Sequence, residues 1–335
     1  MFTLRQYLLA LLDSRGLTRT LGEIDVCRDE QGRPCFSAGN SAAVFRIRLG
    51  GRIRSLRCYL RPMRHLKEIY GQRLLEKELY LHTSPETGVW VDTVLGDWIE
   101  GSTLHETVAQ AAALRDRECL QILVRLFDRL ALALVTDDRA HGDLKPENII
   151  VGDDGTLCPI DFDASYLPAF AGEISPELGT AAYQHPARTA ADFDERIDDY
   201  PAALISTALH ALAEDPTLWD RYGSSDGLLY TPQRIASDPA YRETLALFEK
   251  RGMAVQYRIA QLLTAPTLRL FGLAELLAEA VREKPAARSG TEAETPELFV
   301  ENGRWGYRTA ERVVVAPLYD NGFDTWSAYQ PWYAT

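Results

Sequence analysis

Apolar and polar positions alternate over short runs in the first hundred residues, which is the pattern of half-buried strands. The clearest case is residues 34–60, where two alternating runs meet at Gly50-Gly51 and predict a β-hairpin. Residues 89–99 alternate in the same way and predict two further short strands. This part of the chain is therefore expected to form a small, strand-rich lobe.

Other stretches carry apolar residues at helical spacing. The leucines near the N-terminus predict a short amphipathic helix packed on the body rather than a signal peptide, because charged residues interrupt the run. Residues 66–81 predict a second helix. From about residue 102 the pattern is mostly helical, with a buried helix over 120–135 and further helices over 199–213 and 255–283. A strand-rich small half followed by a helix-rich large half predicts a two-lobed α+β protein with a cleft.

Composition divides the chain further. Residues 284–297 are rich in Ala, Glu, Pro, Ser and Thr and predict a linker. The tail beyond them is dense in aromatic residues and valine, and its turn dipeptides Asn302-Gly303 and Asn321-Gly322 predict a small β unit. The expected order is an N-terminal helix and extension (1–33), a small lobe (34–96), a large lobe (97–283), the linker (284–297) and the β unit (298–335).

Charge and cysteine content narrow the class of protein. Of the 335 residues, 46% are apolar and 25% are charged, which is ordinary for a globular protein with a sizeable core. The 48 acidic and 36 basic residues leave a net charge of -12, which argues against broad nucleic-acid binding and against docking on anionic lipid. No apolar run approaches the length of a membrane span. The five cysteines are scattered without a C-x-x-C pair, so a reducing, cytoplasmic compartment is expected.

Four polar side chains with complementary chemistry stand close together in the sequence. Asp143, Lys145 and Asn148 lie within six residues, and Asp161 follows thirteen residues later. The segment between Asn148 and Asp161 has two apolar runs around an Asp-Gly turn and predicts a hairpin, which brings its ends together. Asparagine and aspartate oxygens suit Mg²⁺, a lysine can neutralise phosphoryl charge, and an aspartate can accept a proton from an attacking hydroxyl. The pattern predicts phosphoryl transfer from a nucleotide.

These stretches resemble the protein-kinase family. HGDLKPEN (141–148) is similar to the family's H-R-D-L-K-P-E-N catalytic loop and IDFD (160–163) to its D-F-G, in a resemblance over roughly residues 34–285. The resemblance implies a two-lobed kinase fold, ATP and Mg²⁺ as cofactors, and a bacterial-type serine/threonine protein kinase with a protein substrate. It implies Asp143 as catalytic base and Lys145 as the γ-phosphate partner. Asn148 and Asp161 would be the Mg²⁺ ligands.

The same resemblance implies residues that support the loop. GTAAYQHP (179–186) is similar to the end of the activation segment, which places Thr180 near the catalytic aspartate. Asp199 looks like the aspartate that supports the catalytic loop from a buried helix, with Asp198 as an alternative register. His141 is expected to be a core histidine satisfied by the backbone rather than a general base.

The small lobe resembles the family's phosphate-binding loop in part. SAGNSAAV (37–44) is similar to G-x-G-x-x-G-x-V with only Gly39 kept. The small residues Ser37 and Ala42 still allow close backbone approach to phosphates, with less freedom at positive φ. Val44 would lie on one side of the adenine and Ile150 on the other.

Further nucleotide contacts follow from spacing within the resemblance. Arg57 stands in the place of the nucleotide lysine, with Arg61 as a rival. Glu76, in the helix expected over 66–81, is its candidate ion-pair partner, with Glu78 as an alternative. DWIEGSTL (97–104) looks like the hinge, where the carbonyl of Asp97 and the N–H of Ile99 would meet adenine.

Four departures from the family pattern bear on activity. Arg57 replaces lysine, and its planar, bulkier guanidinium changes how phosphates are held. Gly142 replaces the loop arginine, so activation by a phosphorylated loop is not expected. Asp163 replaces the glycine after Asp161-Phe162, and Ala187 replaces the glutamate that ends the segment.

Two other classes of function compete with the protein kinase. A pseudokinase, which binds nucleotide or acts as a scaffold, is favoured by Arg57 and the glycine-poor loop. A small-molecule kinase of the aminoglycoside or choline type shares H-G-D and a following asparagine, but Lys145-Pro146-Glu147 counts against it. The tail over residues 302–324 resembles a WG repeat. Such a tail would pack on the large lobe, recruit a substrate, be the stub of a longer array, or be a packing extension of no separate function. The acceptor, the trigger and the oligomeric state are not indicated by the sequence.

Overall fold

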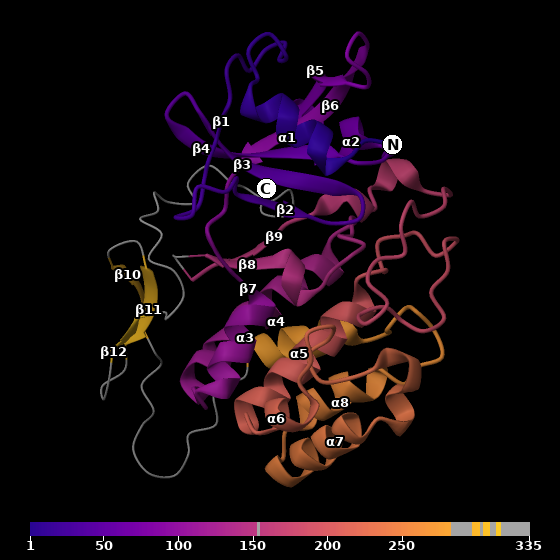
Figure 1. Cartoon of the computed structure of the whole chain (residues 1–335). Helices are drawn as coiled ribbons and strands as arrows, with labels where there is room; N and C mark the ends of the chain where they lie inside the picture. The colour runs from indigo at the N-terminus through magenta and orange to yellow at the C-terminus, as the bar shows by residue number, and fades with distance from the viewer. Residues whose placement is uncertain (153–154, 283–296, 302–303, 309–312, 316–335) are drawn as a thin grey trace. The chain divides into compact units, whose positions relative to one another are not determined.

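The computed structural model describes residues 1–152, 155–282, 297–301, 304–308 and 313–315, in two compact units, Met1–Ile99 and Glu100–Thr335 (Figure 1). The linker expected over 284–297 falls almost wholly outside these ranges, as do the turn dipeptides at 302–303 and 321–322. None of the described helices combines the length and the apolar character needed to cross a membrane.

The first unit is built on one antiparallel sheet. Its strands run in the order β1-β3-β4-β6-β5. Strand β2 pairs with the first part of β3, and β1 pairs with the last part of the same strand. The hairpin expected over residues 34–60 is confirmed: β3 and β4 pair along their whole length across Gly50 and Gly51, which both have positive φ. The strands are β1 (Asp25–Val26), β2 (Phe36–Ala38), β3 (Ala42–Leu49), β4 (Arg52–Tyr59), β5 (Leu74–His82) and β6 (Gly88–Asp97).

The N-terminal helix α1 (Leu4–Leu12) is also confirmed. Thr3 and Gln6 form a reciprocal capping box at its start, which satisfies main-chain N–H groups that the first turn leaves without partners. Tyr7 and Leu11 are buried in the core of the unit, and the hydroxyl of Tyr7 donates to the carbonyl of Tyr59 at 2.6 Å. Burial of one helix face against the sheet therefore holds α1 in place.

Two predictions for this unit are wrong. The helix expected over 66–81 ends after five residues as α2 (Leu66–Tyr70), followed by a short 3-10 turn (Gly71–Arg73) and then strand β5. The two short strands expected over 89–99 are the single strand β6, which supplies the partner for β5. Good helix formers fill residues 74–79, but the chance to pair with a neighbouring strand outweighs their propensity.

Glu78 shows what holds β5 in the extended form. It lies at an irregularity of the strand, between Leu75 and Leu79, and its side chain is 1% exposed. Its carboxylate accepts hydrogen bonds from the main-chain N–H groups of residues 19–21, at 2.8 to 3.1 Å, and from the hydroxyl of Thr20. The four donors to this buried carboxylate come from a distant part of the sequence, so no local sequence pattern predicts the contact.

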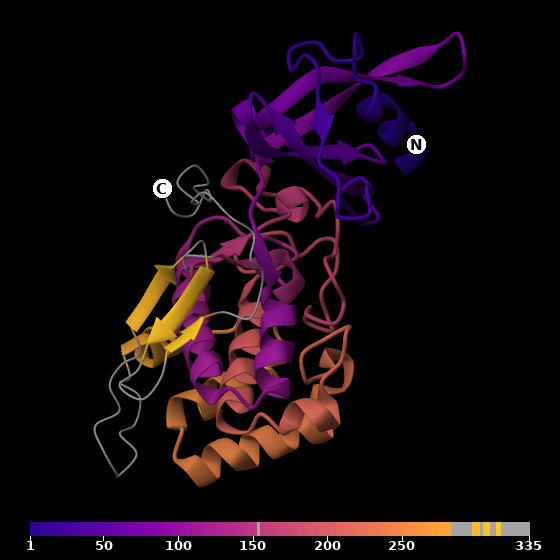
Figure 2. The same cartoon turned by 60° about the vertical axis from the view of Figure 1, so that its left-hand side comes forward.

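The second unit is mostly helical, as expected from residue 102 onward (Figure 2). Helices α4 and α5 pack side by side and form much of the core. Buried Asp128 of α4 joins them, since it accepts from Ser206 at 2.7 Å and lies 2.8 Å from the ring of His210 on α5. The helices are α3 (Leu104–Ala113), α4 (Arg117–Thr136), α5 (Asp199–Glu214), α6 (Leu218–Tyr222), α7 (Pro239–Arg251), α8 (Ala254–Leu262) and α9 (Leu273–Arg282).

Two small sheets complete this unit. Strands β7 (Gly101–Thr103), β8 (Ile149–Gly152) and β9 (Leu157–Pro159) form an antiparallel sheet, which contains the hairpin expected after Asn148. Strands β10 (Glu297–Glu301), β11 (Arg304–Arg308) and β12 (Val313–Val315) form another, so the tail carries β structure as its pattern predicted.

Candidate active site

Asp143 is surrounded by hydrogen-bond donors. One carboxylate oxygen accepts from the main-chain N–H of Thr180 at 2.5 Å, and the other accepts from the amide of Asn148 at 3.1 Å. Lys145 places its ammonium 3.2 Å from that second oxygen and also donates to the hydroxyl of Thr180 at 2.8 Å. The structure therefore brings together four of the residues that the sequence proposed for the site.

His141 anchors the loop that carries Asp143. Its Nε2 lies 2.8 Å from the carbonyl of Ile160, and the main-chain N–H of Asp143 donates to its Nδ1 at 3.3 Å. The ring is fully buried and lies against Phe162. Contacts of this kind, with one nitrogen donating and the other accepting, are those of a core histidine satisfied by the backbone.

The β8–β9 hairpin brings the other two polar residues together. Ile149 pairs with Pro159, and the N–H of Ile160 donates to the carbonyl of Asn148 at 2.8 Å. Asn148 and Asp161 are therefore neighbours at the open end of the hairpin, as predicted. Asp161 has a left-handed backbone, with φ 68° and ψ 63°, which turns the chain sharply out of the hairpin.

The carboxylate that holds the loop is Asp198, the alternative register, and not Asp199. Asp198 is 1% exposed and accepts from the main-chain N–H groups of His141 and, at 3.0 Å, of Gly142. Asp199 accepts from the N–H of Leu270 at 3.2 Å instead. Both face the interior at the start of α5, and adjacent positions in a sequence cannot show which of them reaches the loop.

Asp199 gives a prediction for the pH dependence of stability. Burial raises its pKa from 3.8 to about 7. A carboxyl whose pKa rises on folding contributes stability below its unfolded pKa, and this contribution is lost as the pH rises to about 7. We expect the free energy of unfolding of Asp199→Asn to fall less between pH 4 and pH 8 than that of the wild type. At pH 8 it should exceed the wild-type value by on the order of 1–3 kcal/mol.

Urea unfolding at a series of pH values measures this difference. Burial also raises the pKa of Asp198, but that group is present in both proteins, so the difference between the two curves isolates Asp199. The asparagine keeps an acceptor for the N–H of Leu270. Parallel curves for the two proteins would show that folding leaves the pKa of Asp199 unchanged.

Two glycines let the segments around Asp143 approach closely. Gly142 has φ +80°, and a Cβ there would lie 2.0 Å from the carbonyl oxygen of Ala164. Gly179 has φ +71°, and a Cβ there would lie 2.7 Å from the carbonyl of Gly142 and 3.0 Å from a carboxylate oxygen of Asp143. Both positions need glycine for backbone conformation and for space.

Sequence reasoning missed Arg188, a residue that is only 9% exposed and lies next to the loop that carries Asp143. Its Nη1 donates to the carbonyl of Gly142 at 3.1 Å and to the side chain of Gln184. The sequence signal is only an arginine directly after Ala187, and surface exposure is the ordinary expectation for an arginine.

Candidate nucleotide residues of the first unit share one row across its sheet. Ser37, Val44 and Arg57 lie opposite one another on β2, β3 and β4, and Val94 of β6 continues the row. Directly opposed residues of antiparallel strands point to the same face. The turn before β3 is tight, since Gly39 donates its N–H to the carbonyl of Ala42 at 2.9 Å.

Glu76 is not brought to Arg57. It lies on strand β5 rather than in a helix, its side chain is largely exposed, and it pairs with Lys67 at 3.6 Å. Strand β6 separates β4 from β5 in the sheet. The alternative, Glu78, binds residues 19–21, so neither acid fulfils the expected ion pair.

The remaining hinge and adenine residues lie in different units. Asp97 ends β6, its side chain pairs with Arg54, and its carbonyl accepts from the hydroxyl of Ser55 at 3.1 Å. Ile99 is half-buried at the end of the first unit. Ile150 is buried within β8 of the second unit, opposite Thr103.

A metal ion bound by the described part of the chain would take few protein ligands. These residues contain no group of three or more His, Cys, Asp or Glu side chains placed to hold an ion. The amide nitrogen of Asn148 donates to the main-chain carbonyl and to the carboxylate of Asp143, which leaves its oxygen as the atom that would bind a cation; the carboxylate of Asp161 would supply a second oxygen. Such a two-oxygen set fits Mg²⁺, which takes its other ligands from phosphates and water.

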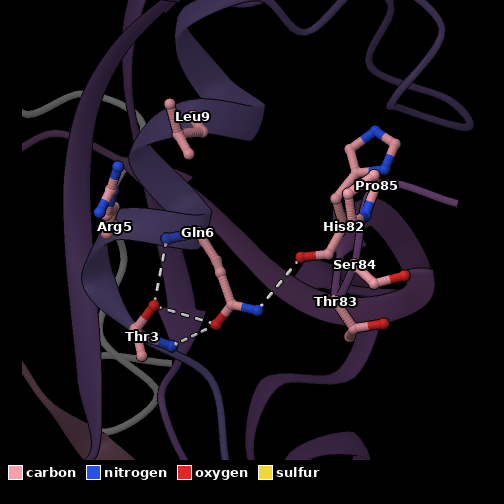
Figure 3. Close-up of a pocket in the computed structure, with 8 residues that line it drawn as sticks. All are labelled: Thr3, Arg5, Gln6, Leu9, His82, Thr83, Ser84 and Pro85. Atoms are coloured by element: carbon pink, nitrogen blue, oxygen red, sulfur yellow. Dashed lines mark hydrogen bonds between the residues drawn. The ribbon is translucent and has the colours of Figure 1, made fainter. Parts of the chain in front are cut away.

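The first unit also has a shallow depression away from these residues. It lies between the start of α1 and the turn that joins β5 to β6 (Figure 3). Gln6 crosses it and donates to the carbonyl of His82 at 3.2 Å. The depression is widely open to solvent, and nothing in its lining matches the chemistry around Asp143.

Comparison with known proteins points to protein kinases. The chain is 28% identical to CBL-interacting protein kinase 17 of Oryza sativa subsp. japonica over 172 residues, which are 49% of this chain and 35% of that protein. It is 34% identical to serine/threonine-protein kinase PknL of Mycobacterium tuberculosis over 113 residues, which are 32% of this chain and 27% of that protein. No family model matches.

These matches cover about a third or less of the length of either relative. At this level they support similarity to a protein-kinase-like superfamily. The mixed α/β architecture, with its antiparallel sheet and helical second unit, is compatible with a kinase-like fold.

Proposed function

We propose that the protein transfers the terminal phosphoryl group of ATP to serine or threonine hydroxyls of protein substrates, with Mg²⁺ and with Asp143 as general base. The observation that carries the proposal is the environment of Asp143, where Thr180, Asn148 and Lys145 all present donors to one carboxylate. These donors hold the carboxylate in place as an acceptor. It is then able to take the proton from an attacking hydroxyl.

The neighbouring residues take complementary roles in the proposal. The ammonium of Lys145 lies between Asp143 and Thr180, so it supplies positive charge beside the point of transfer. Asn148 and Asp161 would hold Mg²⁺, which when bound neutralises charge on the triphosphate. The row of Ser37, Val44 and Arg57 offers a small residue, an apolar surface and a cation to the nucleotide.

Labelled ATP tests the proposal directly. Purified protein is incubated with Mg²⁺ and a generic protein acceptor, beside Asp143→Ala and beside a sample with EDTA. We expect label on serine or threonine in the wild-type sample alone. Label that appears only on small hydroxyl compounds, from a panel in the same assay, would replace the protein acceptor with a small-molecule one.

A second candidate function is a pseudokinase that binds nucleotide without transferring phosphate. The observation that favours it is the placement of Glu76, which lies at an exposed position of strand β5 and pairs with Lys67 of helix α2 rather than with Arg57. The same assay separates the two functions. No label above the Asp143→Ala background, while ATP still raises the melting temperature, supports the pseudokinase.

Arg57→Lys tests the cation in the nucleotide row. Lysine carries the same charge on a narrower, more flexible side chain, so it reaches phosphate as a point charge rather than as a planar fork. If the guanidinium displaces the phosphates, we expect turnover of Arg57→Lys to rise by on the order of tenfold, since misplacement near the reacting centre is costly. Steady-state kinetics for ATP measure it. A fall in turnover would mean that the pocket is built around arginine.

A further inference from the structure

Arg188 links the segment after Thr180 to the loop that carries Asp143. Its Nη1 donates to the carbonyl of Gly142, directly before Asp143, at 3.1 Å. The same nitrogen donates to the side chain of Gln184, four residues earlier in the chain. A single buried guanidinium therefore ties the two segments that also meet at the bond between Thr180 and Asp143.

The charge of Arg188 also acts on this loop. Burial lowers the pKa of the guanidinium, while the nearby carboxylates of Asp198 and Asp143 raise it. The cation thus lies within electrostatic reach of both the loop's anchor and the proposed base. Position 142 cannot supply such a charge, because any side chain there would meet the carbonyl of Ala164.

The arrangement is poorly explained by stability alone. Within the part of the chain that the structure describes, Nε and Nη2 of Arg188 are buried and have no hydrogen-bond partner. Burying a cation with several donors unpaired costs free energy, and buried charges often stabilise less than apolar groups of similar size. A role in placing the loop accounts for the retained charge and for its bond to the carbonyl before Asp143.

We propose that Arg188 is a positioning residue, whose buried guanidinium holds the Gly142 carbonyl and thereby sets the Asp143 carboxylate for phosphoryl transfer. The proposal rests on the proposed function for its kinetic consequence, but the positioning itself is independent of turnover. Misplacing a general base by a fraction of an ångström slows the chemical step more than it weakens nucleotide binding.

Kinetics provide the first test. We expect Arg188→Met to lower kcat by about 10- to 100-fold and to change KM for ATP by less than about threefold. In Arg188→Ala, millimolar guanidinium ion should restore several-fold of the lost kcat, because it can occupy the vacated space. The matched control is Arg221→Met, an exposed arginine paired with Glu243, which should retain wild-type kcat.

Hydrogen exchange gives a readout that does not depend on activity. We expect the peptide covering residues 140–148 to exchange faster in Arg188→Met than in the wild type or in Arg221→Met, at a temperature where all three are folded. Should Arg188→Met not fold, Arg188→Lys carries the same comparison with its charge retained.

Two results would overturn the proposal: unchanged exchange of this peptide in the folded variant, or a kcat that stays within about twofold of the wild type. A wild type without transfer activity removes the proposed function instead. The exchange experiment then still decides whether Arg188 positions the loop.

Discussion

Asp143→Asn is expected to lower phosphoryl transfer by about 10²- to 10⁴-fold, the usual contribution of a general base. All three groups around this side chain are donors: the N–H of Thr180, the amide of Asn148 and the ammonium of Lys145. A carboxylate accepts from all of them, whereas an amide has one oxygen and must turn its own N–H groups toward a donor. The variant therefore loses both the base and part of the loop's order.

Initial rates with labelled ATP, together with thermal unfolding, measure the two effects. We expect a loss of stability of about 1–3 kcal/mol from the misdirected donors. Asp220→Asn is the matched control, since it makes the same chemical change in an exposed ion pair with Arg115. It should retain wild-type transfer and stability to within about 0.5 kcal/mol. Transfer above a tenth of the wild-type rate in Asp143→Asn would mean that another group accepts the proton.

Gly142→Arg, which restores the residue of the kinase-family pattern, is expected to destabilise the protein by roughly 3 kcal/mol or more. The backbone of Gly142 has φ +80°, which a residue with a Cβ adopts only at a cost. A Cβ there would also lie 2.0 Å from the carbonyl oxygen of Ala164, a main-chain atom that cannot rotate away. Relief requires the loop to move, and the loop carries the hydrogen bond that the N–H of Gly142 donates to the carboxylate of Asp198.

Urea unfolding compares this variant with two others. Gly142→Ala introduces the same Cβ without the long side chain and should account for most of the loss. Gly172→Ala is the matched control, because Gly172 has φ +87° but nothing within 4 Å of its added Cβ. It should cost only about 1 kcal/mol. If Gly142→Arg is no less stable than Gly172→Ala, the loop relaxes freely and the glycine is not required for space.

The two variants address different requirements of the same loop. Asp143 needs a set of donors converging on one carboxylate, and Gly142 needs an unobstructed approach to residue 164. A departure from the family pattern at position 142 is therefore accompanied by a local fold that excludes the family's residue. The steric limit at this position therefore argues against the interpretation that Gly142 is simply the loss of a functional arginine.

Local patterns in the sequence determined much of the second unit. The apolar run over residues 120–135 lies within helix α4, and the hairpin expected after Asn148 is formed by the pairing of β8 with β9. These elements follow from hydrogen bonds and periodicities that involve residues close in sequence. The offsets between Asp143, Lys145 and Asn148 place all three on one short loop, so their proximity was also determined locally.

Only the tertiary structure decided the features that depend on distant partners. Residues 74–79 have the composition of a helix, yet strand β6 and the donors around Glu78 hold them extended. The adjacent acids Asp198 and Asp199 are equivalent in the sequence, and only packing directs one toward the loop and the other toward Leu270.

Arg188 is the strongest case. Its burial and its bond to Gly142 join positions 46 residues apart, and a charged side chain carries no periodic signal for either. The sequence by itself determined which chemical groups the protein has and which of them share a loop. The tertiary structure decided which of those groups meet, because side-chain direction and burial depend on contacts between segments that the chain brings together only on folding.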